Sequence, residues 1–198
     1  KESDANTPLG LKLKHSLADR LVYSKLRDFF GGRLRACITG GAALSDDIYL
    51  IFTGAGIPIM QGYGLTETSP VISSNNPFDI RLGTVGKPIR NVQVRIAEDG
   101  EIEATGPGVM LGYYRKEQAT RDAFTEDGWF CSGDLGKFDR DGHLFIVGRA
   151  KDVIVLPSGK NVHPEDLEVH YLKAPEAEEL AIIGVADAAE GRAGAGRG

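Results

Sequence analysis

The segment from Leu34 to Thr68, LRACITGGAALSDDIYLIFTGAGIPIMQGYGLTET, decides the fold. Its two short apolar runs, Leu34–Ile38 and Ile57–Met60, have the length and composition of buried strands. Between them, Ser45 followed by two aspartates is a typical helix start, so we expect a helix through Phe52. Strand, helix and strand in this order predict parallel pairing and an α/β layer.

The region before this segment is expected to form one amphipathic helix, Leu11–Phe30. Apolar residues recur there at helical spacing, with charged residues between them: Ala18, Val22, Leu26 and Phe29. Gly31 and Gly32 supply a helix end. The helix therefore adds to the same α/β layer.

After Pro77 the pattern changes to short apolar runs separated by turn residues, such as Val92–Ile96 and Glu101–Ala104. This pattern is typical of antiparallel strands, and we expect a small barrel or curled sheet. The sequence also predicts a short helix, Lys116–Phe124, and a hairpin, Leu135–Val147, that turns at residues 139–142.

A domain boundary is expected near residues 150–152. It divides the chain into 1–149, with an α/β part (1–76) and a mainly β part (77–149), and 150–198. The second unit should contain a strand at Val153–Leu156, a helix from Pro164, and a strand at Leu180–Val185. The glycine-rich tail, residues 191–198, has no apolar period and is expected to be disordered.

Composition excludes several classes of protein. The 198 residues are 41% hydrophobic and 26% charged with a net charge of −5, which is ordinary globular material without the basic patch of a nucleic-acid-binding protein. Only two cysteines, Cys37 and Cys131, are present, which favours a reducing compartment. No apolar run approaches the roughly 20 residues of a membrane span, and residues 1–4 are unlike a signal peptide. We expect a cytoplasmic protein, and association with a membrane surface stays open.

The run Gln61–Thr68 carries residue types that suit a nucleotide. It lies at the carboxyl end of the second strand, where open α/β sheets bind ligands. Tyr63 can stack on a purine, and Gly62 and Gly64 let the backbone approach the ligand. The Thr66 hydroxyl can reach phosphate, and Glu67 is a hard oxygen ligand for Mg²⁺. The alternative is a turn with an ordinary helix cap.

Asp134 lies in an apolar and aromatic neighbourhood, where a carboxylate needs hydrogen-bond donors. A ribose diol would supply two donors, whereas the alternative is a turn aspartate bonded to nearby amides. The four histidines lack metal-ligand spacing and are expected to lie on the surface without a metal: His15, His143, His163 and His170.

Four runs together resemble the AMP-forming acyl-CoA synthetases of the adenylate-forming superfamily. They are Gly40–Leu44, Tyr63–Glu67, Gly128–Gly136 and Gly148–Ile154, within a similarity that covers Leu11–Val185. Three further stretches look most like bacterial long-chain fatty-acid–CoA ligases: Leu17–Leu44, Thr84–Tyr114 and Ser158–Glu168.

The resemblance implies a two-step reaction in which a fatty acid and ATP give acyl-adenylate and pyrophosphate, and CoA then displaces AMP. By motif, Gly41, Ala42 and Ala43 would line the adenine, Tyr63 would stack on it, Thr66 would hold the α-phosphate, and Glu67 would bind Mg²⁺. Asp134 and Arg149 would hold the ribose, Lys151 would be the hinge of a small mobile C-terminal domain, and Gly159 would line the CoA channel.

Two elements of the family pattern are not found in the sequence: the upstream phosphate loop and the C-terminal adenylation lysine. We therefore expect an internal fragment with little ligase activity of its own. Ser132 stands where the family usually has threonine and keeps the hydroxyl. Adenylation of another carboxylate, as by an aryl-CoA ligase or a peptide-synthetase adenylation domain, stays open, as do a non-catalytic nucleotide-binding fragment and the oligomeric state.

Overall fold

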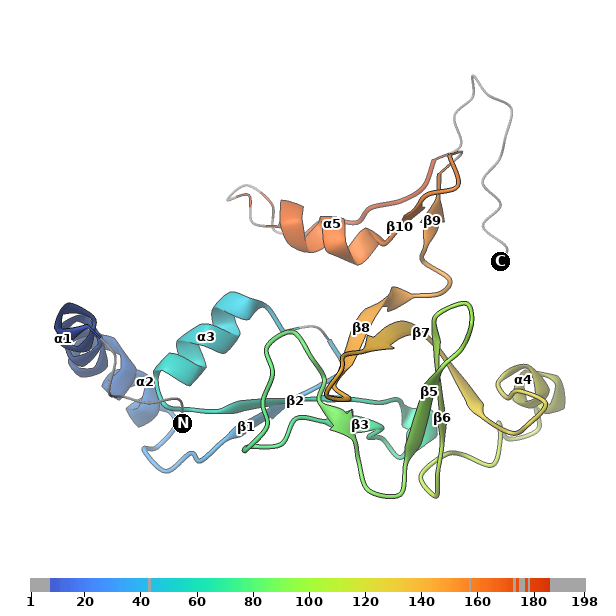
Figure 1. Cartoon of the computed structure of the whole chain (residues 1–198), viewed down its shortest axis with the longest axis horizontal. Helices are drawn as coiled ribbons and strands as arrows, with labels where there is room; N and C mark the ends of the chain where they lie inside the picture. Colours follow the sequence, from blue (N-terminus) through green and yellow to red (C-terminus); the bar gives the residue numbers. More distant parts are fainter. Residues whose placement is uncertain are drawn as a thin grey trace.

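The computed structural model describes residues 8–42, 44–156, 158–172, 174, 177 and 179–185. It contains two four-stranded sheets and a smaller unit that stands to one side of them (Figure 1). The tail at residues 191–198 lies outside the described residues.

The first sheet has the order β1-β2-β3-β4, formed by Cys37–Thr39, Ile59–Tyr63, Ser73–Ser74 and Lys87–Pro88. β1 and β2 are parallel, as predicted, and the other pairs are antiparallel. Both strands begin later than predicted because Pro58 has no N–H to donate to a ladder. The register therefore opens with Cys37 opposite Ile59, and the Pro58 carbonyl accepts from the Cys37 N–H at 2.9 Å.

Three helical segments precede this sheet: α1 (Leu9–Ala18), a π-helical turn (Asp19–Tyr23) and α2 (Ser24–Phe29). They form the predicted helix, which meets the end of α3 (Asp46–Gly54) through an Arg27 hydrogen bond of 2.8 Å to the Ala55 carbonyl. Ser45 caps α3 as predicted, since its hydroxyl accepts from the Ile48 N–H at 3.4 Å. No residue of α1, the π turn or α2 is buried in the described part of the chain.

The second sheet confirms the antiparallel prediction, with the sequential order β5-β6-β7-β8. Its strands are Gln93–Ile96, Glu101–Thr105, Phe130–Phe138 and Leu144–Arg149, and α4 (Glu117–Asp122) interrupts them. Irregular register at Glu101/Glu103 and at Leu135/Gly136 bends the sheet. Its core includes Ile102, Ala104, Phe130 and Leu144, all buried.

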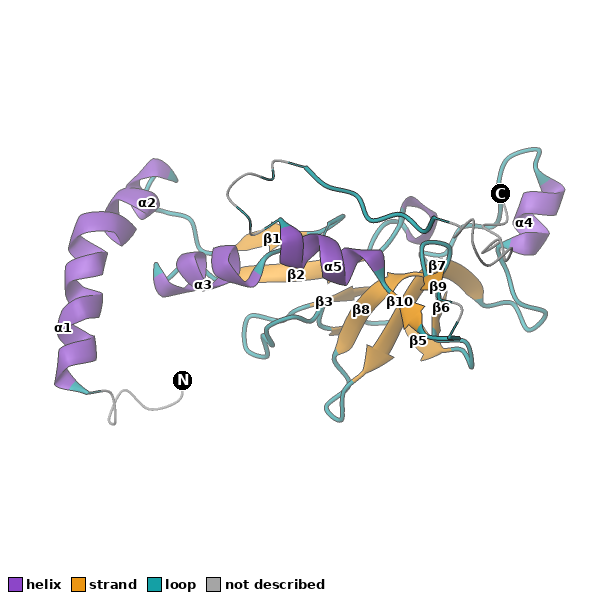
Figure 2. Cartoon of the chain, turned by 90° about the horizontal axis from the view of Figure 1, so that it is seen from above, coloured by secondary structure: helices purple, strands orange, loops and turns teal. Residues whose placement is uncertain are grey.

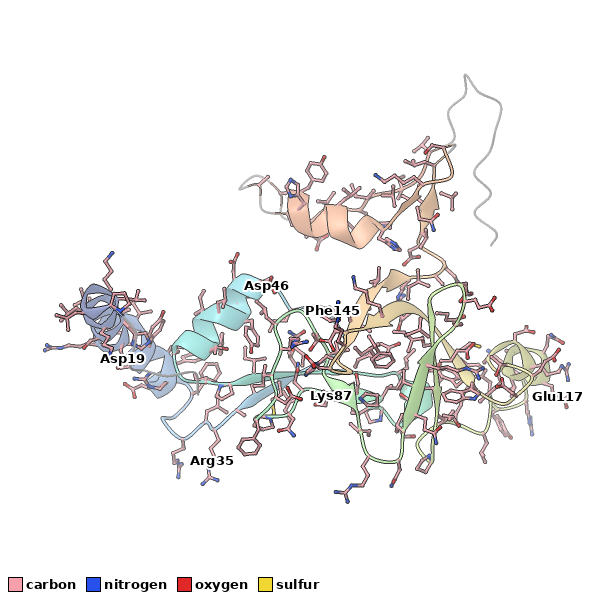
Figure 3. The ribbon with its side chains drawn as sticks, viewed as in Figure 1. Asp19, Arg35, Asp46, Lys87, Glu117 and Phe145 are labelled. Atoms are coloured by element: carbon pink, nitrogen blue, oxygen red, sulfur yellow. The ribbon has the colours of Figure 1, made fainter. Side chains whose placement is uncertain are left out.

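The two sheets are joined beside the start of β8. The Val85 N–H donates to the Leu144 carbonyl at 2.9 Å, and the Leu144 N–H donates to the Gly86 carbonyl at 2.7 Å. Gly86 has a φ of +78°, and a Cβ there would lie 2.1 Å from the Ser74 carbonyl carbon, so only glycine fits. Figure 3 labels Lys87, the next residue, near this junction.

The third unit contains β9 (Ile154–Val155), β10 (Asn161–Val162) and α5 (Pro164–Tyr171) (Figure 2). The predicted strand Leu180–Val185 is wrong, because these residues join no strand ladder. The Ile182 N–H donates instead to the Glu168 side chain, Oε1, at 2.9 Å, and a side-chain acceptor cannot propagate a ladder.

Three further observations concern the cysteines, the helices and one histidine. Cys37 and Cys131 are free thiols. Across the described ranges, no helix is both long enough and apolar enough to cross a bilayer. His143 is 2% exposed, so its expected surface position is wrong. Its Nε2 lies 3.1 Å from Oδ1 of Asp79, a residue 64 positions away in the sequence. This polar partner offsets the free-energy cost of burying the ring nitrogen.

Candidate nucleotide-binding site

The turn after β2 is fixed by backbone geometry. A Cβ on Gly64 would lie 1.8 Å from the Pro70 carbonyl oxygen, so no other residue fits there. The hydroxyl oxygen of Thr68, 4% exposed, lies 2.9 Å from the carbonyl oxygens of both Leu65 and Pro70 and accepts from the Leu65 N–H at 3.0 Å. Sequence reasoning missed Thr68, although a hydroxyl three residues after Leu65 is a typical cap signal.

Tyr63 ends β2 and contacts the second sheet. Its hydroxyl donates to Asp134 Oδ2 at 2.7 Å, across a separation of 71 positions in the chain. Burial, with a further contribution from this hydrogen bond, raises the pKa of Tyr63 well above its usual range. The phenol is therefore a neutral donor at physiological pH, and the two predicted site residues lie together.

Arg149 lies beside the same carboxylate. Asp134 on β7 is opposite Arg149 on β8 in the antiparallel register, and Arg149 Nε is 3.7 Å from Asp134 Oδ1. The Asp134 side chain is 16% exposed, whereas that of Arg149 is 72% exposed. The guanidinium is thus available to a ligand that reaches Asp134.

The turn around Asp134 is held by neighbouring side chains, and among the described residues the Asp134 carboxylate accepts from no backbone amide, so the alternative of a turn aspartate is not observed. The Asp134 N–H donates to the Ser132 hydroxyl at 3.1 Å, and the Gly133 N–H donates to Glu101 Oε1 at 2.7 Å. Burial raises the pKa of Glu101, and the Gly133 hydrogen bond opposes that rise. The backbone groups are satisfied by these neighbours, which leaves the Asp134 side chain to Tyr63, to Arg149 and to any ligand.

Glu67 belongs to the short 3-10 turn Thr66–Thr68. Its Oε1 accepts from the Tyr113 hydroxyl at 2.9 Å, and its Oε2 has no hydrogen-bond or ion-pair partner among the residues the structure describes. Mg²⁺ in proteins is commonly held by one or two carboxylates together with substrate phosphates, so a free oxygen here fits that ion. The Thr66 side chain is exposed on the same turn.

The loop after β1 approaches the same strand. A Cβ on Gly40 would lie 3.0 Å from the Gly62 carbonyl oxygen, and Gly41 has a φ of +84°, which favours glycine. This contact brings Gly40 beside Gly62, whereas a Cβ on Gly41 would meet no described atom within 4 Å, and the adenine-lining role expected of Gly41 and Ala42 stays a prediction. Ala43 lies outside the described residues.

Lys151 and Gly159 stand apart from this group. Lys151 is exposed in the turn after β8, and Gly159, with a φ of +81°, lies in the turn between β9 and β10 with open space around it. Within the described ranges, no hydrogen bond or ion pair connects either residue to Tyr63, Glu67 or Asp134. Their expected roles as hinge and CoA-channel residues stay predictions.

A second polar cluster surrounds the hairpin turn of β7 and β8. His143, Asp139 and Asp141 lie close together, and the Arg81 guanidinium pairs with both aspartates. The Asp139 carboxylate also accepts from the N–H groups of Asp141 and His143, each at 2.9 Å. These hydrogen bonds and ion pairs stabilise the turn between β7 and β8, which is the hairpin turn predicted at residues 139–142.

Comparison with known proteins identifies the family of this chain. The model of the AMP-binding enzyme family matches residues 12–114, just over half of the chain. The chain belongs to this family of adenylate-forming enzymes. The long-chain-fatty-acid–CoA ligase FadD15 of Mycobacterium tuberculosis is 47% identical over 174 residues, which cover 88% of this chain and 29% of that relative.

Two solved structures are also similar to this chain. O-succinylbenzoate coenzyme A synthetase from Bacillus subtilis, in complex with ATP and magnesium ion, has a TM-score of 0.72 and 29% identity, covering 83% of this chain and 38% of that one. ATP-bound MatB from Rhodopseudomonas palustris has a TM-score of 0.69 and 34% identity, covering 77% and 32%. The chain thus spans less than two fifths of the length of each relative.

Proposed function

We propose that this chain supplies the adenylate-binding part of a ligase that activates a long-chain fatty acid with ATP and transfers it to CoA. The observation that carries the proposal is the 2.7 Å hydrogen bond between Tyr63 and Asp134, which brings two distant motifs to one place. The 47% identity to a long-chain-fatty-acid–CoA ligase supports the substrate class.

The joined pair determines how a nucleotide would lie. A base stacked on the Tyr63 ring has its ribose on the side of Asp134, where the carboxylate accepts from the two ribose hydroxyls and Arg149 adds a donor. The Gly41–Ala42 loop, with Ala43, would border the adenine next to Gly62. The exposed Thr66 hydroxyl would then face the α-phosphate.

The chemistry requires positive charge near the phosphates. Mg²⁺ held at Glu67 would offset the phosphate charge while the fatty-acid carboxylate attacks and pyrophosphate leaves. Glu67 would bind through Oε2, the oxygen without a protein partner. Lys151 would act as the hinge of the unit that follows residue 150, and Gly159 would approach CoA after that unit moves.

Pyrophosphate exchange tests this proposal in the full-length gene product that contains this chain. We expect Mg²⁺-dependent exchange of label between pyrophosphate and ATP with palmitate, and palmitoyl-CoA formation after CoA is added. Exchange with an aryl carboxylate in place of palmitate would overturn the substrate class and favour the sibling activity. Absence of exchange with either acid would overturn the enzymatic proposal itself.

A further inference from the structure

The loop from Gly106 to Tyr113 lies against the turn that carries Glu67. A Cβ on Gly108 would be 2.8 Å from the Thr68 carbonyl oxygen, so glycine permits this close approach. The Met110 N–H donates to the Glu67 carbonyl at 2.7 Å. The loop therefore fixes the backbone of Glu67 independently of its side chain.

Tyr113, at the end of this loop, reaches the Glu67 side chain. Its hydroxyl donates to Oε1 at 2.9 Å, and its own N–H donates to the Thr120 hydroxyl of α4 at 2.9 Å. A Cβ on Gly112 would lie 2.6 Å from Thr120 Cγ2, so the preceding glycine is needed for this contact. The backbone of Tyr113 is thus held by α4, the helix on which Figure 3 labels Glu117.

This hydrogen bond limits how the carboxylate can turn. A free glutamate side chain samples several rotamers, whereas a bond at Oε1 retains those that direct Oε2 away from Tyr113. A tyrosine phenol, whose usual pKa is about 10, is a neutral donor at physiological pH. A neutral donor orients the carboxylate without cancelling its charge.

We propose that Tyr113 is a positioning residue that orients the Glu67 carboxylate for Mg²⁺. The inference rests on the proposed function, in which Glu67 is the metal ligand, and it adds a residue outside the motif that contains Glu67. Loss of a residue that hydrogen-bonds to a metal ligand and orients it commonly lowers metal affinity by about 10-fold to 100-fold. Tyr113 is 37% exposed, so water can replace part of its hydrogen bond, and we expect the lower end of this range.

The test is Tyr113→Phe in the full-length gene product, measured as pyrophosphate exchange against Mg²⁺ concentration. We expect the Mg²⁺ concentration for half-maximal rate to rise roughly tenfold, with the rate at saturating Mg²⁺ nearly unchanged. Tyr114→Phe is the matched control, because Tyr114 is adjacent, 82% exposed, and its hydroxyl has no hydrogen bond in the described part of the chain.

A double-mutant comparison separates positioning from general structural damage. In a Glu67→Gln background, Tyr113→Phe should leave the remaining Mg²⁺ dependence unchanged, because its effect passes through the Glu67 carboxylate. The inference is overturned by a Tyr113→Phe response equal to that of Tyr114→Phe, by a loss of rate that saturating Mg²⁺ does not restore, or by an undiminished effect beside Glu67→Gln. In each of these three outcomes the wild-type protein still exchanges pyrophosphate, so only the role of Tyr113 fails. If the wild-type protein itself shows no Mg²⁺-dependent exchange, the proposed function and the inference are both overturned.

Discussion

Tyr63→Phe removes one hydroxyl from the contact between the two sheets and leaves the aromatic ring in place. The lost bond is 2.7 Å long and ends on a carboxylate that is 16% exposed. Hydrogen bonds to charged groups contribute about 1.5–3 kcal/mol. Because Asp134 keeps some solvent access and the nearby Arg149, we expect the free energy of unfolding to fall by about 1.5–2 kcal/mol, in the lower part of that range.

Urea denaturation of this chain measures that change, and Tyr49→Phe is its control. Tyr49 is 8% exposed, and its hydroxyl makes no hydrogen bond among the described residues, so its loss should cost little. The free energies of unfolding of the two variants should therefore differ by at least about 1 kcal/mol. Equal values within about 0.5 kcal/mol, the usual range for neutral substitutions, would refute the role given to this hydrogen bond.

The same pair should also produce a dependence on alkaline pH. The folded-state pKa of Tyr63 is raised above the unfolded value of about 10, so the folded state favours the protonated phenol. Its contribution to stability is complete below about pH 10 and declines as pH rises further, because the unfolded chain ionises first. The stability advantage of wild type over Tyr63→Phe should shrink between pH 9 and pH 11. An advantage that grows over this interval would contradict the assigned sign.

Two further changes test the local geometry. Gly64→Ala places a Cβ 1.8 Å from the Pro70 carbonyl oxygen and should lower the free energy of unfolding by about 3 kcal/mol. The control is Gly62→Ala, whose Cβ would lie 3.5 Å from its nearest neighbour and which should lower the free energy of unfolding by about 1 kcal/mol or less. Similar losses for the two variants in urea denaturation would argue against the clash at Gly64. The hydrogen bond from Arg95 lowers the pKa of Asp127, so this carboxylate stabilises the fold at neutral pH and loses that effect as pH falls below about 4. Asp127→Asn should therefore lower the Tm at pH 7 more than at pH 3, and equal losses at the two pH values would count against the ion pair.

Local signals in the sequence predicted most of the secondary structure. The cap at Ser45, the 3.6-residue period of the first helix and the turn at residues 139–142 each depend on neighbours within a few positions, and each is confirmed. The failures depend on distant partners. The run Leu180–Val185 has strand composition but pairs with no strand in the part of the chain that the structure describes. The His143 ring is buried with its Nε2 beside the Asp79 carboxylate.

The candidate site shows the same limit. Spacing alone could not join Tyr63 to Asp134, and the resemblance to a family supplied that expectation before the 2.7 Å contact was seen. Tyr113 was missed because its partner is 46 positions away and a tyrosine beside a turn is unremarkable in sequence. Thr68 was missed because the whole run Gln61–Thr68 was interpreted as a nucleotide-binding motif, and no separate structural role was assigned to its last hydroxyl.

The hydroxyls of Tyr63 and Tyr113 each connect segments that are far apart in the sequence. Both donate to a carboxylate, that of Asp134 and that of Glu67 respectively. A lysine or arginine at either position would supply a stronger bond, but its charge would repel Mg²⁺ at Glu67 and would compete with the ribose hydroxyls at Asp134. A phenol with a raised pKa orients each acid and leaves the negative charge available. The Arg149 guanidinium is 3.7 Å from Asp134 and mostly exposed, so the carboxylate keeps the capacity to accept from a ligand.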